Sequence, residues 1–168
     1  MSAPATALAV ARRTDEVLAL LEPAEALYSR LILVVGRGRS GKSTVLRKVA
    51  EQTGAEVCNM GLLLSEGLLA CEPRQYPLRC GELLDDYVRG LAAGPALLDN
   101  IDLLFDKMLA VDPMSLLQKV ARSQTVVAAW RGHVDRGMLH YAIPGHREWR
   151  STPVNGVLLV DLNPGEIP

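Results

Sequence analysis

The chain has 168 residues, of which 49% are hydrophobic and 22% charged, and a formal net charge of -1. This length is typical of one domain, and the balanced charge argues against a protein that coats nucleic acid. The longest apolar runs, such as 31–35 and 156–160, are far shorter than the roughly 20 residues of a membrane-crossing helix.

The N-terminal segment 1–13 is mildly apolar, but its two arginines follow the apolar part instead of preceding it as in a secretory signal. We therefore expect a cytoplasmic protein with a flexible terminus over 1–13 and a single domain over 14–168. The three cysteines lack the spacing of a zinc or redox motif, so we expect reduced structural thiols. They are Cys58, Cys71 and Cys80.

Apolar residues at helical spacing predict one or two helices over 14–30, with a kink or break at Pro23. The unalternating apolar run 31–35 predicts a strand buried on both faces of a parallel sheet. A helical pattern follows over 42–52. The later segments predict strands over 55–60, 95–100, 125–130 and 156–162, helices over 62–70, 82–92 and 115–122, and a loop through Pro73 and Pro77. Strands that alternate with helices predict a three-layer α/β fold, with a mostly parallel sheet of about five strands and helices on both faces.

Residues 36–43 read GRGRSGKS and lie between a predicted strand and a predicted helix. They satisfy G-x-x-x-x-G-K-[ST], the phosphate-binding loop (P-loop) of nucleoside triphosphatases, in its required context. Successive backbone N–H groups of such a loop point at one phosphate, and the helix adds its positive N-terminal dipole. We expect Lys42 to reach the β and γ phosphates of ATP and the Ser43 hydroxyl to bind Mg²⁺. The residues expected to contact the nucleotide are Gly36, Arg37, Gly38, Arg39, Ser40, Gly41, Lys42, Ser43 and Thr44.

An acid and an amide end the third predicted strand. A nucleotide-bound Mg²⁺ needs a second protein contact, and Asp99 fits that role. ATPases with an extra strand beside the phosphate loop commonly place a Glu next, to polarise the attacking water, where this chain has Asn100. An amide orients water but cannot accept its proton, so we expect slow hydrolysis. Asp102 is an alternative proton acceptor, although an orientation away from the site, as a helix cap or solvated acid, is favoured.

Arginines follow the fourth predicted strand. Arg131 is a candidate contact to the terminal phosphate, although a surface position is favoured, and Trp130 is expected to pack in the core rather than to stack on adenine. Arg147 and Arg150 are candidate arginine fingers that act in trans on a neighbouring molecule's nucleotide. The histidines lack metal-ligand spacing. The segment after the fourth strand is too short for the helical lid of an AAA+ ATPase, so we expect a core without that lid.

The segments LLDNIDLLFD (97–106), DPMSLLQ, TVVAAWRG and LHYAIPGHREWR follow one another along the chain. In this order they resemble BrxF, a family of small P-loop proteins from BREX phage-exclusion systems, over the stretch 31–162. The L-D-N strand end and a tail similar to Y-A-x-P-G-H-x-E-Y-R carry the resemblance, with Trp149 in place of the tail's tyrosine. The resemblance implies a role in a bacterial antiviral system beside a methyltransferase, a large ATPase and an alkaline-phosphatase-like protein. It also makes Asn100 part of the family pattern.

These features favour an ATP-dependent switch or assembly factor whose partners are other BREX proteins or further copies of itself. One alternative is a small-molecule kinase that closes the segment 132–150 over the phosphates. Another is an accessory protein that binds DNA through a local basic patch. That patch would consist of Arg37, Arg39, Arg47 and Lys48. The guanine-reading motif N-K-x-D is absent from the sequence, which favours ATP over GTP.

Overall fold

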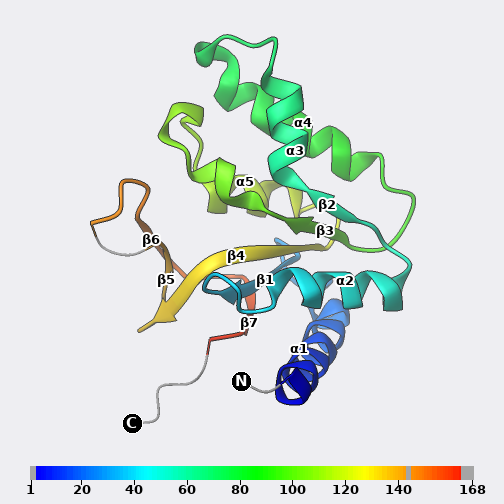
Figure 1. The fold of residues 1–168 in the computed structure, drawn as a ribbon. Helices are drawn as coiled ribbons and strands as arrows, with labels where there is room; N and C mark the ends of the chain where they lie inside the picture. The colour runs from blue at the N-terminus through cyan, green and yellow to red at the C-terminus, as the bar shows by residue number, and fades with distance from the viewer. Residues whose placement is uncertain (1–2, 143–144, 164–168) are drawn as a thin grey trace.

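A parallel sheet lies at the centre of the molecule, with helices on both of its faces (Figure 1). The computed structural model describes residues 3–142 and 145–163. The sheet has the strand order β2-β3-β4-β1-β7, and every neighbouring pair along this path is parallel. This arrangement confirms the predicted α/β class and the mostly parallel sheet.

The helices and strands alternate along most of the chain. The helices are α1 (Ala3–Ala24), α2 (Lys42–Thr53), α3 (Met60–Leu68), α4 (Tyr76–Arg89) and α5 (Pro113–Val120), with 3₁₀ turns over Pro73–Gln75, Ile101–Phe105 and Lys107–Leu109. The strands are β1 (Leu31–Gly36), β2 (Val57–Asn59), β3 (Ala96–Asp99), β4 (Val126–Asp135), β5 (Met138–Tyr141), β6 (Arg150–Pro153) and β7 (Leu158–Asp161).

Strand β1 is buried along its whole length and contributes to both layers of the core. Leu31, Leu33 and Val35 pack with the layer of α3, α4 and α5, whereas Ile32 and Val34 pack with the layer of α1 and α2. Alternate side chains of a strand point to opposite faces, so an unalternating apolar run suits a strand that is covered on both sides.

Local signals set several helix ends. Gly54, with a φ of 75°, ends α2 as its N–H donates to the Ala50 carbonyl. Asn59 caps α3 because its side-chain oxygen accepts a hydrogen bond from the Leu62 N–H at 3.1 Å. Pro77 lies in the first turn of α4, where a missing N–H costs no hydrogen bond. Helix α4 therefore begins at Tyr76, and the predicted start at residue 82 is wrong.

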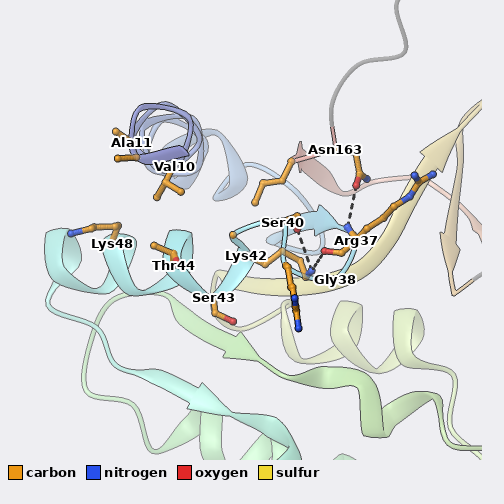
Figure 2. Close-up of a pocket in the computed structure, with 14 residues that line it drawn as sticks. Val10, Ala11, Arg37, Gly38, Ser40, Lys42, Ser43, Thr44, Lys48 and Asn163 are labelled. Atoms are coloured by element: carbon orange, nitrogen blue, oxygen red, sulfur yellow. Dashed lines mark hydrogen bonds between the residues drawn. The ribbon is translucent and has the colours of Figure 1, made fainter. Parts of the chain in front are cut away.

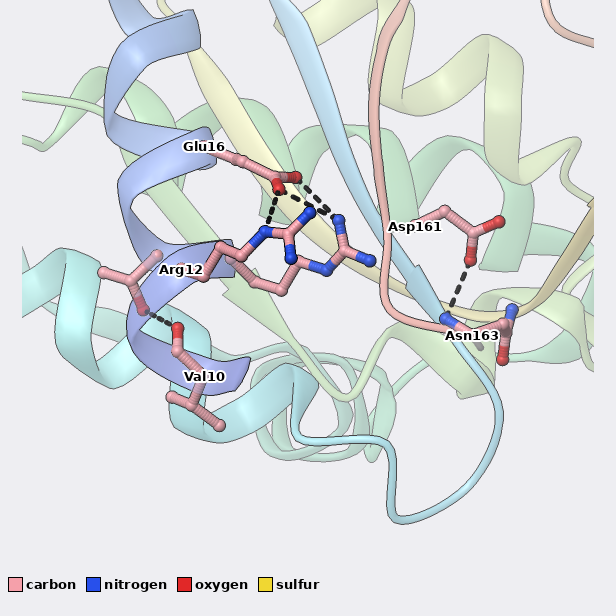
Figure 3. Close-up of polar contacts among 7 residues, drawn as sticks. Val10, Arg12, Glu16, Asp161 and Asn163 are labelled. Atoms are coloured by element: carbon pink, nitrogen blue, oxygen red, sulfur yellow. Dashed lines mark hydrogen bonds and ion pairs between the residues drawn. The ribbon is translucent and has the colours of Figure 1, made fainter. Parts of the chain in front are cut away.

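The N-terminal helix is longer than the sequence pattern predicts. Helix α1 begins at Ala3, so the segment 3–13, predicted to be a flexible terminus, is helical. Pro23 lies in the last turn of α1, and the helix ends one residue later instead of kinking. An ion pair between Arg12 and Glu16 at 3.8 Å lies along its exposed side (Figure 3).

Strand β4 is ten residues long and continues beyond the parallel sheet. Its first part pairs with β1 and β3, and its second part pairs with β5 in an antiparallel hairpin that β6 extends. Figure 1 shows β4 curving out of the sheet toward β5. The sequence pattern did not predict β5, β6 or this extension.

The described cysteines are unpaired, and Cys58 and Cys80 are buried. Burial raises the pKa of both thiols. Within the described part of the chain, no helix combines the length and the apolar character that a membrane crossing requires.

Candidate functional site

The loop of residues 36–43, called the glycine loop below, joins β1 directly to the first turn of α2 (Figure 2). Its conformation requires glycine at two positions. Gly41, the residue before α2, has a φ of 97°, in the left-handed region that disfavours a side chain. A Cβ at Gly36 would lie 2.1 Å from Ser40 Oγ, because the loop folds back on itself there. These are the two glycines that the sequence motif specifies.

Lys42 holds the glycine loop closed. Its ammonium group donates hydrogen bonds to the Arg37 carbonyl at 2.8 Å and to Ser40 Oγ at 3.3 Å. Burial lowers the pKa of Lys42, and the nearby carboxylates of Asp102 and Asp99 oppose that shift. The lysine therefore lies partly desolvated among acids, where an added anion would interact strongly with it.

The strand order brings the glycine loop and Asp99 to the same edge of the sheet. β4 lies between β1 and β3, and the three strands run parallel, so the carboxyl ends of β1 and β3 meet Arg131 in the middle of β4 at one edge. A cavity of about 350 Å³ lies there, called the Asp99 cavity below. Its lining includes Lys42, Ser43, Asp99, Asn100, Asp102 and Arg131. The structure thus brings together predicted site residues from three separate segments of the chain.

Asn100 lies in a strained conformation beside Asp99. Its φ is 54°, and its backbone N–H donates to the Asp99 carboxylate at 2.8 Å. Its side-chain amide donates to Asn59 Oδ1 at 3.1 Å, the same oxygen that caps α3. A Cβ at Gly61 would lie 2.5 Å from the Asn100 amide nitrogen, so this contact needs a glycine opposite. The amide of Asn100 thereby links the ends of β2 and β3.

Asp102 lies on the wall of the Asp99 cavity, and the expectation that it faces away is wrong. The 3₁₀ turn that follows Asn100 carries it back toward β4, where its carboxylate lies 3.8 Å from the Arg131 guanidinium. The buried Tyr141 ring lies close by. Desolvation raises the pKa of its hydroxyl, and the Asp102 carboxylate adds to that shift. Arg131 is exposed and also lies beside Gly38 on the lining of the Asp99 cavity, so its contact to a terminal phosphate stays a prediction.

A second cavity, of about 950 Å³, lies on the other side of the glycine loop and is called the α1 cavity below. Gly38, Lys42 and Ser43 line both cavities, whereas Thr44 lines only the α1 cavity. Helix α1 and Leu162 form its apolar side, and Figure 2 shows Val10 facing the glycine loop. The sequence analysis assigned no site role to these residues.

Asn163 connects the glycine loop to β4. Its side-chain oxygen accepts a hydrogen bond from the Arg37 N–H at 3.0 Å, and its amide nitrogen donates to the Gly132 carbonyl at 3.0 Å. Its own backbone N–H donates to the Asp161 carboxylate at 2.9 Å (Figure 3). No motif in the sequence identifies this residue, since the two partners of its side chain, Arg37 and Gly132, lie more than thirty residues away.

The remaining candidates lie outside the Asp99 cavity. Trp130 is buried and packs edge to face on Phe105, with a centroid separation of 5.0 Å, which confirms a packing role. The Arg150 guanidinium lies 5.9 Å from the centroid of the Phe105 ring, in a groove that also includes Trp149. Arg147 is exposed in the turn before β6. A role for Arg147 or Arg150 in trans stays a prediction.

The residues predicted to hold Mg²⁺ fit that ion as part of a nucleotide complex. The Ser43 hydroxyl and the Asp99 carboxylate line one cavity and are oxygen donors, which Mg²⁺ prefers. Among the described residues, no group of three or more His, Cys, Asp and Glu side chains could hold a metal by itself. Phosphate oxygens would complete the coordination.

Comparisons of the chain with protein-family models, curated proteins and solved structures found no match. The residues of the site therefore carry the functional argument.

Proposed function

We propose that this chain is a P-loop NTPase that binds Mg–ATP on the glycine loop and acts as a nucleotide-dependent switch or assembly factor. One observation carries the proposal. The loop with Lys42 and Ser43 opens into the cavity that holds Asp99. Strand β4 lies between β1, which precedes the loop, and β3, which ends at Asp99. A magnesium triphosphate needs amides, an ammonium group and a nearby carboxylate in this relation.

Each described site residue has a defined task in this proposal. Backbone N–H groups of the glycine loop and Lys42 hold the phosphates, and Ser43 binds Mg²⁺ directly. Asp99 contacts Mg²⁺ or its water ligands. Arg131 neutralises charge on the terminal phosphate once it separates from Asp102. Asn100 orients water without accepting its proton, so hydrolysis by the isolated chain is slow.

Calorimetric titration of the full chain with Mg–ATP tests the binding step. Replacing Lys42 by alanine should weaken ATP binding about 10- to 100-fold, since it removes a charge-assisted hydrogen bond. Lys119→Ala removes the same group from an exposed position on α5 and should leave the affinity unchanged. Equal ATP affinity of Lys42→Ala and Lys119→Ala would contradict the proposal.

Sedimentation and turnover test the switch. We expect the sedimentation coefficient of the protein to differ between ADP and a non-hydrolysable ATP analogue, and steady-state turnover to stay below about 10 s⁻¹, the ordinary enzyme median. The resemblance to BrxF suggests other BREX proteins as partners. Faster turnover by the isolated chain, or identical sedimentation in both states, would argue against a slow switch.

A second candidate, a small-molecule kinase, is favoured by one further cavity. This space, of about 350 Å³, shares Gly38 and Arg131 with the Asp99 cavity. Arg37 and His133 also line it, and these are groups that suit an anionic acceptor. ATP consumption that occurs only with an added phosphate acceptor would favour this function over the switch.

A further inference from the structure

We propose that the α1 cavity holds the nucleoside part of the nucleotide against an apolar wall, and that this wall accepts adenine and guanine about equally. The inference rests on the proposed function, because it assumes that the phosphates lie on the glycine loop. It changes the expected ligand from ATP alone to purine nucleoside triphosphates as a class.

The wall is one face of helix α1. Ala7, Val10 and Ala11 line the cavity and are spaced by three and four residues, so they lie together on the helix surface. A Cβ at Gly41 would lie 3.5 Å from Val10 Cγ2, which places α1 at van der Waals distance from the end of the glycine loop. Leu162 adds a further apolar side chain. The volume of about 950 Å³ is at the upper end of ordinary small-molecule sites.

The two cavities fix the direction of the bound nucleotide. Lys42 and Ser43 line both, so a polyphosphate on the loop reaches from one cavity into the other. Asp99 lies only in the smaller cavity, which assigns the magnesium-bound terminal phosphates to that side. The nucleoside then extends past Thr44 toward α1, into the larger cavity.

Three polar side chains that line this cavity, those of Asn163, Thr44 and Lys48, already have partners in the described structure, whereas Arg39, which also lines it, is exposed. Both ends of the Asn163 amide are used, by the Arg37 N–H and the Gly132 carbonyl. Thr44 Oγ accepts from Arg47 at 3.2 Å, and Lys48 pairs with Glu51 at 3.4 Å. Methyl groups contact adenine and guanine alike, whereas a site that hydrogen-bonds a base edge discriminates by about 10⁴-fold or more.

Helix α1 packs on the core layer that it shares with α2. Thr14 is buried, and its hydroxyl donates to the Val10 carbonyl at 2.7 Å within the helix. Val17 and Ala24 are fully buried in the core layer of α1 and α2. The wall is therefore preformed, and contact with it requires little ordering of the protein.

A ligand series on the full-length protein tests the inference. ATP, GTP and inorganic tripolyphosphate are titrated separately, each with Mg²⁺, and dissociation constants are measured by calorimetry. We expect ATP and GTP to bind within about fivefold of each other, because methyl contacts discriminate weakly. Both should bind at least about tenfold more tightly than tripolyphosphate, which lacks the group that contacts the apolar wall.

A matched pair of variants locates the contact. Val10→Ser removes two methyl groups from the wall and should weaken ATP and GTP equally, by about three- to tenfold, without changing tripolyphosphate binding. Ala9→Ser introduces the same hydroxyl group at an exposed position of α1 outside the cavity lining, and should change none of the three affinities.

The outcomes separate the two levels of the proposal. A preference for either purine above about 50-fold would overturn the equal acceptance of bases, since only hydrogen bonding gives such discrimination. Tripolyphosphate that binds as tightly as ATP, with Val10→Ser unchanged, would overturn the nucleoside wall and leave the phosphate loop intact. Failure of all three ligands to bind would instead overturn the proposed function itself.

Discussion

The two sides of the Asp99 cavity are built in different ways. The glycine loop is a run of consecutive residues between β1 and α2, and its shape depends on two glycines within it. The opposite side is assembled from Asp99, Asp102 and Arg131, which come from the end of β3, a 3₁₀ turn and the middle of β4. The loop side therefore depends on local backbone geometry, and the opposite side depends on the strand order and on how β4 leaves the sheet.

The largest effect is expected where β4 leaves the sheet. A Cβ at Gly132 would lie 1.7 Å from the His140 carbonyl oxygen on the paired strand β5. Gly132→Ala should therefore force the hairpin apart and lower the free energy of unfolding by about 3 kcal/mol. Urea denaturation followed by circular dichroism measures this loss.

The control for that variant is Gly81→Ala in helix α4. A Cβ there would meet Leu116 Cδ1 at 3.8 Å, an ordinary contact. The change should leave stability unaltered or raise it by about 0.5–1 kcal/mol, because alanine favours a helix interior. Equal stability of the Gly132 and Gly81 variants would mean that the tight β4–β5 contact does not constrain the fold.

A smaller effect, on binding more than on stability, is expected in the glycine loop. Gly36→Ala should weaken ATP binding about 10- to 100-fold, since its Cβ would displace Ser40, which Lys42 contacts. Gly81→Ala serves again as the control, because it adds the same methyl group in α4, outside the lining of both cavities. Both affinities are measured by calorimetry. Similar ATP affinity of the two variants would show that the fold-back at Gly36 does not shape the phosphate site.

The same contrast explains how much of the site the sequence predicted. The motif residues Gly36, Gly41 and Lys42 act within a few positions of one another, so their pattern is visible in one stretch of sequence. Asp99 was predicted as well, because the ends of neighbouring parallel strands meet at one edge. The orientation of Asp102 was predicted wrongly, since it depends on the turn that follows Asn100 and on Arg131, which lies 29 positions further along the chain.

The fold shows the same division. Strands β1, β3 and the start of β4 were predicted because a strand that helices cover on both faces needs apolar side chains at successive positions. Its sequence is therefore an unbroken apolar run. Strands β5 and β6 are short and partly polar, and their pairing with an extended β4 is a long-range property that no local pattern encodes. The early start of α1 did have a signal, since alanine recurs through its first turns and favours helix.

Asn163 joins the two sides, and its removal gives the smallest of the expected effects. Asn163→Ala deletes the hydrogen bonds to the Arg37 N–H and the Gly132 carbonyl. Two neutral, partly exposed hydrogen bonds contribute about 1–2 kcal/mol together, so we expect ATP affinity to fall about five- to tenfold and the melting temperature to fall by a few degrees.

Asn155→Ala is the matched control, because Asn155 is exposed and its backbone carbonyl, rather than its side chain, accepts the hydrogen bond from Gln118. Combining Asn163→Ala with Gly36→Ala sharpens the comparison. If Asn163 acts by holding the glycine loop in shape, the double variant should lose less affinity than the two single losses added together, since both changes disturb the same loop. Strictly additive losses would show that Asn163 acts on β4 alone and that the two sides of the cavity are energetically separate.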